Sequence, residues 1–186
     1  MPDLIPLPDN VQLKPLTSTE ALDFFRGKLD TQVTFSSDAL WQAEHNITRT
    51  VSRLTSADLV NDIYALLEKD IAEGLDPAAF AKTLRAKLEK AGWWGQREVV
   101  DPATGEIVST RFDPPRLRLI YDVNVHQAFS AGRWERIERN RDTHPIIVYR
   151  TMRDERVRAS HARWDGLALP IDSPFWQIGR ASCRER

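Results

Sequence analysis

Cysteine, glycine and long apolar runs are scarce in this sequence. Its 186 residues include one cysteine and eight glycines. A single cysteine cannot form an internal disulfide, which agrees with synthesis in a reducing compartment. No apolar run approaches the ~20 residues that span a bilayer, so we expect no membrane contact. The formal net charge of −1 gives no overall electrostatic reason to bind nucleic acid.

The last nine residues, 178–186, resemble a translated sequencing adapter. Their codons can be written as one reading frame of a widely used short-read adapter, and Gln177 fits the bases that precede it. Segments of such origin are excluded from fold reasoning. We therefore expect the natural coding sequence to be cut off after Trp176, with residues 177–186 an artefact. The single cysteine, Cys183, lies in this segment.

Periodic apolar residues predict helices in the first half of the chain. Residues 17–20 have the pattern of a capping box for a short helix over 21–29. Another short helix is expected over 37–46. Apolar residues at intervals of three and four predict helices over 56–74 and 77–91. A short loop between these two predicts a helical hairpin.

A different pattern follows the helical hairpin. Residues 97–100 and 107–110 alternate like strands, and a turn with proline and glycine joins them. The longest helix is predicted over 115–140, and a strand over 146–150. We expect the rest, to Trp176, to be short strands and turns packed on the long helix.

These elements predict a fold that is mainly α with a small β element, of the α+β class. The expected order is helical hairpin, β-hairpin, long helix, then short strands and turns. We divide the chain into an extended arm at 1–16, a helical region at 17–95 and a second region at 96–176.

Seven phrases have an order and spacing that resemble the phage Mu F-like head morphogenesis family. They are Phe24 to Leu29, Gly92 to Gly95, Val99 to Glu106, Pro115 to Asn124, Ala131 to Arg133, Arg156 to His161 and Asp172 to Trp176. The resemblance runs across about residues 15–176, which is nearly all of the chain before the adapter-like segment. It implies a minor head protein, assembled in the host bacterial cytoplasm and then placed inside the virion head. Its implied partners are the portal protein and other head or scaffold proteins.

The same resemblance bears on metal binding. Family members continue past the Phe-Trp pair into a segment with a Cys-x-Cys pair, which this chain does not contain, so region 96–176 is interpreted as truncated. Ser173 also stands where the family often has an aspartate. His161 and Asp165 lie four residues apart and could supply part of a structural zinc site if those cysteines existed. Otherwise we expect no cofactor, and the alternative is a histidine hydrogen-bonded in a turn.

Two groups of apolar residues are candidates for binding a partner. The arm 1–16 contains four prolines, so it is expected to be extended, with little chain around it to bury its apolar side chains. Adjacent tryptophans cannot both face one core from an extended segment, so one of that pair could be an exposed anchor. Packing against the long helix is the alternative for them. The candidates are Trp93, Trp94, Leu4, Ile5 and Leu7.

Arginine-rich stretches allow a further alternative, an internal virion protein with weak DNA contact. Four arginines lie between positions 150 and 158, but Asp154 and Glu155 interrupt them. In a β segment, Arg156 and Arg158 would share a face. A solvated or salt-bridged surface is the favoured interpretation, because the net charge is near zero.

No catalytic motif is visible in the sequence. It has no phosphate-binding glycine loop, no nucleophile elbow and no His-Glu-x-x-His pair. Ser160 and His161 are adjacent, so they would lie on opposite sides of a strand and could not act as a serine–base pair. We therefore expect a binding protein and not an enzyme. The alternative is a metal-dependent or toxin-like enzyme domain, because domains of this family can be joined to toxin-like catalytic domains.

Overall fold

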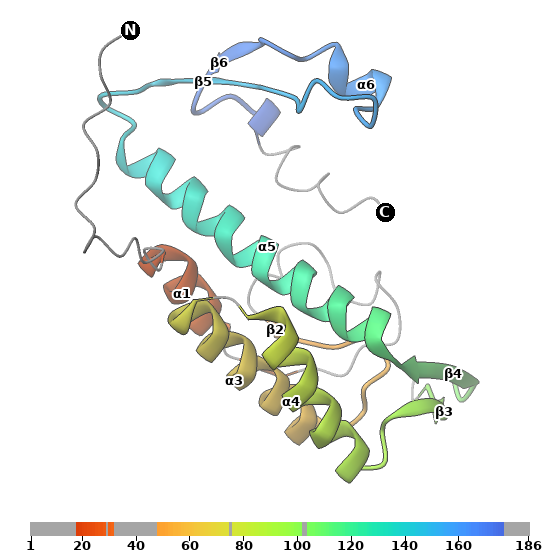
Figure 1. Ribbon diagram of the computed structural model, residues 1–186. Coiled ribbons are helices and arrows are strands. Elements are labelled where there is room, and N and C mark those ends of the chain that lie inside the picture. Colours follow the sequence, from red (N-terminus) through yellow and green to blue (C-terminus); the bar gives the residue numbers. More distant parts are fainter. Residues whose placement is uncertain (1–17, 29, 32–47, 75, 102–103, 177–186) are drawn as a thin grey trace, which may run out of the picture.

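Long helices and three small strand pairs make up the computed structural model, which describes residues 18–28, 30–31, 48–74, 76–101 and 104–176. The predicted α+β class is confirmed (Figure 1). In chain order the elements are α1 (Thr19–Arg26), β1 (Asp30–Thr31), β2 (Thr48–Arg49), α3 (Ala57–Glu73), α4 (Pro77–Lys90), β3 (Gly95–Val100), β4 (Ile107–Phe112), α5 (Pro114–Arg139), β5 (Ile146–Val148), α6 (Ala159–Ala162) and β6 (Ala168–Pro170).

The predicted helical hairpin is α3 and α4, and side-chain caps fix where each helix begins. The Ser56 hydroxyl accepts a hydrogen bond from the Leu59 amide, which would otherwise be unsatisfied in the first turn of α3. Gly74 ends α3 at a φ of 122°, a conformation that favours glycine. Asp76 then caps α4 by accepting from the first free amides of that helix.

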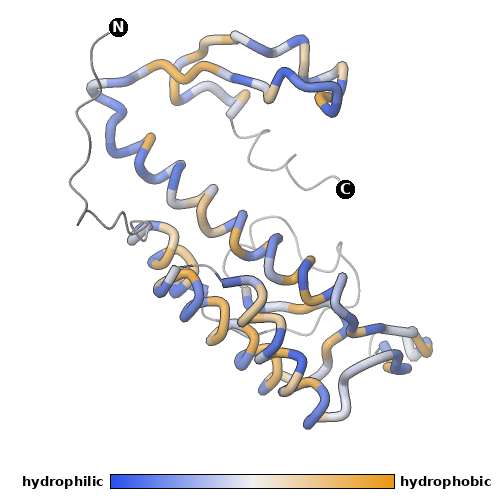
Figure 2. The backbone as a smooth tube through the Cα atoms, viewed as in Figure 1, coloured by the Kyte–Doolittle hydropathy of each residue, from blue (hydrophilic) through white to orange (hydrophobic). Residues whose placement is uncertain are grey.

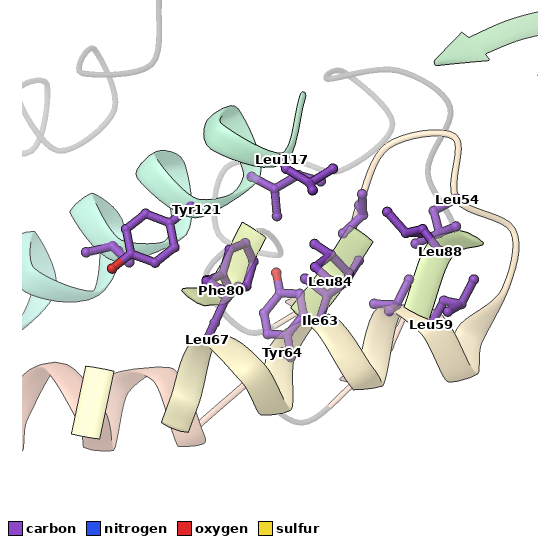
Figure 3. Packing of buried hydrophobic residues seen from close by; sticks show 14 of the residues in the cluster. Leu54, Leu59, Ile63, Tyr64, Leu67, Phe80, Leu84, Leu88, Leu117 and Tyr121 are labelled. Atoms are coloured by element: carbon purple, nitrogen blue, oxygen red, sulfur yellow. The ribbon is translucent and has the colours of Figure 1, made fainter. Parts of the chain in front are cut away.

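Helix α5, which the sequence predicted as the longest helix, carries the central apolar stripe. The Asp113 carboxylate caps its first turn. The stripe packs against α3 and α4, and Figure 3 shows Leu117 and Tyr121 of α5 facing Phe80 and Leu84. The buried residues of the helix are Leu117, Ile120, Tyr121, Asn124, Val125, Ala128 and Gly132.

The short helix α1 crosses α5 at a glycine. A Cβ atom added at Gly132 would lie 2.7 Å from the backbone nitrogen of Ala21, so the two helices approach as closely as they do because no side chain intervenes. The predicted cap of α1 is wrong by one residue. Ser18, and not Thr17, is the cap, because its hydroxyl accepts from the Ala21 amide. The helix ends at Arg26, earlier than predicted.

The β-hairpin β3–β4 was predicted, although its strands extend further than expected. It is antiparallel and pairs Gly95 with Phe112 and Val100 with Ile107. A hydrogen bond of 2.9 Å from the Asp101 amide to the Glu106 carbonyl closes the turn. β1 and β2 form a separate two-residue parallel pair beside α3.

The segment after α5, residues 140–176, differs from expectation, and we call it the C-terminal module. It contains the ribbon of β5 and β6 and the short helix α6. The prediction that these elements pack on the long helix is wrong. Within the described residues β5 and β6 pair with each other, and no extensive contact joins the module to a helix of the core (Figure 1).

Some predictions concern residues that the structure does not describe. The arm at 1–16, with Leu4, Ile5 and Leu7, lies outside the described residues, and so do the expected helix over 37–46 and the segment 177–186. Among the described residues, no helix combines the length and apolar character needed to cross a bilayer.

Candidate interaction site in the C-terminal module

Aromatic rings form a small core of their own in the C-terminal module. Tyr149 at the end of β5 contacts Trp164 and Phe175, with ring centroids 6.0 and 6.1 Å apart. Trp164 also meets Phe175 at 5.3 Å, edge to face. Such edge-to-face pairs add to the stabilisation that burial provides. We call Tyr149, His161, Trp164, Phe175 and Trp176 the aromatic cluster.

Hydrogen bonds tie this cluster to the ribbon. The indole nitrogen of Trp176 donates to the Pro170 carbonyl at 2.8 Å. The Tyr149 amide donates to the Leu167 carbonyl, also at 2.8 Å. Trp176 therefore folds back onto the end of β6.

His161 belongs to this cluster. Its ring packs against Trp164 at 5.5 Å, and its Nδ1 lies 3.1 Å from the Tyr149 hydroxyl. The residue lies on the four-residue helix α6, not on a strand. The expectation that Ser160 and His161 lie on opposite sides of a strand is therefore wrong, because both are on this helix. The environment of His161 is that of a histidine hydrogen-bonded within a turn-rich segment.

Asp165 holds the loop that follows β5. One carboxylate oxygen accepts from the Thr151 amide at 2.9 Å, and the other forms an ion pair of 2.8 Å with Arg153. The Thr151 amide, and then Arg153, lower the pKa of this carboxyl below its usual value. Both oxygens thus have protein partners.

His161 and Asp165 consequently face different neighbours. Among the described residues, no group of three or more His, Cys, Asp or Glu side chains is arranged to hold a metal ion. The proposed structural zinc site would need further ligands from outside residues 140–176, and it stays a prediction.

The outer face of the β5–β6 ribbon is apolar and exposed. Side chains alternate along a strand, so Ile146 and Val148 lie on one face and Ile147 on the other. Ile146 is 60% exposed and Val148 is 45% exposed. Figure 2 shows this apolar stretch in orange, next to the hydrophilic turn that leads to α6. We call the exposed side chains of Ile146, Val148, Ala168 and Pro170 the ribbon face.

The tryptophan pair contributes to the helical core. Trp93 is buried and meets Phe112 edge to face at 5.9 Å. Trp94 is half-buried and packs against the core, with the Arg85 guanidinium 4.8 Å from its ring. Neither indole is fully exposed. Gly92 and Gly95, on either side of the pair, have φ values of 70° and 87°, which let the chain turn there. Partner binding by this pair stays a prediction, and only Trp94 has surface available for it.

The arginine-rich stretch 150–158 is a loop, so the expectation that Arg156 and Arg158 share the face of a strand is wrong. Two of its arginines form ion pairs with carboxylates. Arg153 pairs with Asp165, and Arg156 lies 3.4 Å from Asp154. These ion pairs agree with the favoured interpretation, a salt-bridged surface.

Sequence reasoning missed both the aromatic cluster and the ribbon face. The rings come from positions 149, 161, 164, 175 and 176, which have no common period. One signal was present: the last part of the module is dense in aromatic residues although it has no periodic apolar stripe.

The model of one protein family matches residues 61–184, and its description is phage Mu protein F like protein. The match extends into the segment interpreted as an adapter product, and that interpretation stays a prediction. No solved structure matches the chain.

Two curated proteins are similar to the chain. The putative capsid assembly protein F of Escherichia phage Mu is 32% identical over 162 residues, which is 87% of this chain and 37% of that protein. The Mu-like prophage FluMu F protein of Haemophilus influenzae is 31% identical over 136 residues, which is 73% of this chain and 32% of that protein. The chain thus spans about a third of the length of these relatives.

Proposed function

The chain belongs to the phage Mu protein F-like family, and we propose that it acts in the assembly of a phage or prophage head by binding other head proteins. One relative is named a putative capsid assembly protein, which supports this role. The portal protein and other head or scaffold proteins are the proposed partners. Assembly in the host cytoplasm, followed by a place inside the head, is part of the same proposal.

The ribbon face is the observation that carries this proposal. Apolar side chains on a small strand pair are normally covered, and large exposed apolar patches mark interaction sites. Ile146 and Val148 are exposed, and within the described residues no helix packs against β5 or β6. A head protein that covers this face would bury apolar area and stabilise the module at the same time.

Catalysis has less support from the geometry. The His161 Nδ1 lies against the Tyr149 hydroxyl, and both oxygens of Asp165 have partners within the module. We therefore propose that the chain works by binding and has no enzymatic activity of its own. Weak DNA contact is a secondary proposal, and the ion pairs of Arg153 and Arg156 with carboxylates do not favour it.

The direct test is incorporation into heads. The chain would be produced together with the other head proteins of its phage or prophage, and assembled heads would be purified and analysed. A variant with Ile146→Lys and Val148→Lys should be lost from the heads, because lysine on the ribbon face prevents apolar contact. The matched control is Leu119→Lys, which changes an apolar residue on α5 that is 53% exposed. Equal incorporation of both variants would contradict the proposal.

A further inference from the structure

The outer edge of β5 has backbone groups that are not paired. The Tyr149 amide donates to the Leu167 carbonyl, so the odd-numbered residues of this strand direct their backbone groups toward β6. Backbone groups alternate along a strand, and those of Ile146 and Val148 therefore point away from β6. Within the part of the chain that the structure describes, neither residue has a backbone hydrogen bond to a residue outside the ribbon. This edge therefore offers N–H and C=O groups at the spacing of a β-ladder.

The edge of β6, in contrast, is closed. Its outward-facing residues are Ala168 and Pro170, and proline has no N–H to donate. The Pro170 carbonyl already accepts from the Trp176 indole at 2.8 Å and from the Ser173 amide at 3.0 Å. A strand that joins this ribbon therefore joins it at β5.

β5 lacks the features that usually protect a sheet edge. Natural sheets commonly protect an exposed edge with proline, a bulge or a charged side chain. β5 pairs with β6 residue for residue, without a bulge, and its outward-facing residues are the exposed Ile146 and Val148. Pro145 precedes the strand, but its carbonyl accepts from the Ile171 amide, so the N–H that this proline lacks would also lie on the β6 side. An unprotected edge of this kind is a template for another strand.

We propose that a head protein supplies an extended segment, which pairs with β5 as an antiparallel third strand. The proposal rests on the proposed function and specifies how the partner binds. Two residues of the segment exchange backbone hydrogen bonds with Ile146 and Val148 across the open edge. In complexes formed by strand addition, the backbone hydrogen bonds provide affinity, and side chains at alternate positions provide specificity.

The ribbon face determines two side chains of the partner segment. Directly opposite residues of paired strands lie on the same face of a sheet. The residues opposite Ile146 and Val148 are therefore apolar, because β-branched and aromatic pairs stabilise neighbouring strands. Together they extend the ribbon face from two strands to three.

Arg150 determines a third side chain, which is acidic. It lies two residues after Val148, and its side chain is exposed. Arg153 and Arg156 form ion pairs with carboxylates, whereas Arg150 forms no ion pair with any residue that the structure describes. Directly opposite residues of unlike charge stabilise a strand pair. In the antiparallel direction, the partner segment thus has an aspartate or glutamate two residues before the apolar residue opposite Val148.

Replacement of a single backbone amide by an ester tests whether the partner uses the edge of β5. In the full chain, Val148 is replaced by its α-hydroxy acid, which removes the N–H and keeps the side chain. The ribbon should stay intact, because this N–H points away from β6. The variant is produced with the head proteins in competition with the parent chain. Its recovery in purified heads should fall by about three- to tenfold, because one hydrogen bond of the interface is lost.

The ester at Ala168 is the matched control. The Ala168 N–H also points outward, but it lies on the closed edge of β6, so recovery in heads should equal that of the parent. Hydrogen exchange confirms that each variant is folded, since the Ile147 and Tyr149 amides face β6 and should stay protected. For the charge, Arg150→Glu should lower recovery, and Arg150→Lys should restore it. Equal recovery of these two variants would overturn the assignment of an acidic partner residue.

The outcomes separate this proposal from the proposed function. Loss of the Ile146→Lys, Val148→Lys variant together with full recovery of the Val148 ester would overturn strand pairing and leave the proposed function standing. It would show that the partner covers the side chains without using the backbone edge, as a helix does. Full recovery of both would overturn both proposals. Slow exchange of the Ile146 and Val148 amides in the purified chain alone would also overturn strand pairing by a head protein. The edge would then be filled by the chain itself or, if dilution removes the protection, by a second copy.

Discussion

The described residues between 18 and 139 enclose one continuous apolar cluster, whereas residues 140–176 are held by a few aromatic rings and hydrogen bonds. The core cluster includes residues from every helix of that region, and Figure 3 shows those of α3, α4 and α5. The module has fewer than ~40 residues, a size at which domains usually need a metal, a disulfide or a partner to be stable. The core therefore has extensive apolar packing of its own, whereas the module has only a small set of internal contacts.

The two regions also differ in how polar groups are placed. In the core, Asp70 accepts hydrogen bonds from the Tyr121 hydroxyl and from the Asp76 amide, so one carboxylate joins α3, α4 and α5. Burial and this hydrogen bond raise the pKa of Tyr121 well above its usual value. In the module, Asp165 joins the turn after α6 to the loop that follows β5. The hydrogen bonds of Asp70 thus join three helices of the core, whereas those of Asp165 stay within the module.

The largest effect is expected from Leu84→Ala, because Leu84 is fully buried between α3 and α5. Truncation of a buried leucine leaves a cavity and should cost about 2–5 kcal/mol of unfolding free energy. Urea unfolding followed by far-ultraviolet circular dichroism measures this change. The Trp164 indole resonance should not shift in the folded variant, because the module has its own core.

Leu119→Ala is the control for this experiment, since Leu119 is exposed on α5. It should change the unfolding free energy by less than about 0.5 kcal/mol. A shift of the Trp164 resonance in the Leu84→Ala variant would show that core and module form one cooperative unit, and it would remove the basis of the comparison.

A smaller effect is expected from Gly132→Ala. The new methyl group would lie 2.7 Å from the Ala21 backbone nitrogen, and backbone cannot move aside as a flexible side chain can. Forcing α1 away should cost about 1–3 kcal/mol, against a gain of about 1 kcal/mol in helix propensity. Thermal unfolding should therefore show net destabilisation. Ser130→Ala, at an exposed position of the same helix, should be neutral or slightly stabilising, and an equal response of both variants would contradict the close approach.

The sequence predicted the helical core well because that region is periodic and capped. Ser56, Asp76 and Asp113 cap three helices whose first residues the sequence predicted to within one or two positions. The long helix α5 was also predicted, since the apolar residues on one face of a long helix repeat regularly. The one misplaced cap, Thr17 for Ser18, arose because neighbouring hydroxyl residues have the same chemistry.

The module was predicted poorly, for a physical reason. Tyr149, His161 and Trp164 meet through loops, and loop geometry leaves no period in the sequence. Exposure of Ile146 and Val148 could not be predicted either, because an apolar strand has the same pattern whether or not another element covers it. The sequence alone therefore predicted a strand here and did not predict that the ribbon face is exposed.

The smallest effect is expected at low pH, where protonation of Asp165 should change the module and leave the core unchanged. The Thr151 amide and Arg153 lower the pKa of Asp165, so its folded-state pKa lies below the usual value of 3.8. A carboxyl with a lowered pKa adds stability above its unfolded pKa, and this contribution is lost as pH falls through the folded value. In a titration below pH 3.8, the Thr151 amide resonance should move as its hydrogen bond weakens. Asp165→Asn should remove this movement and leave the resonances of α3 unchanged. Asp172→Asn is the control, because Asp172 pairs with Arg141 and does not touch Thr151. If the titration of Thr151 persisted without Asp165, another carboxyl would have to hold the loop.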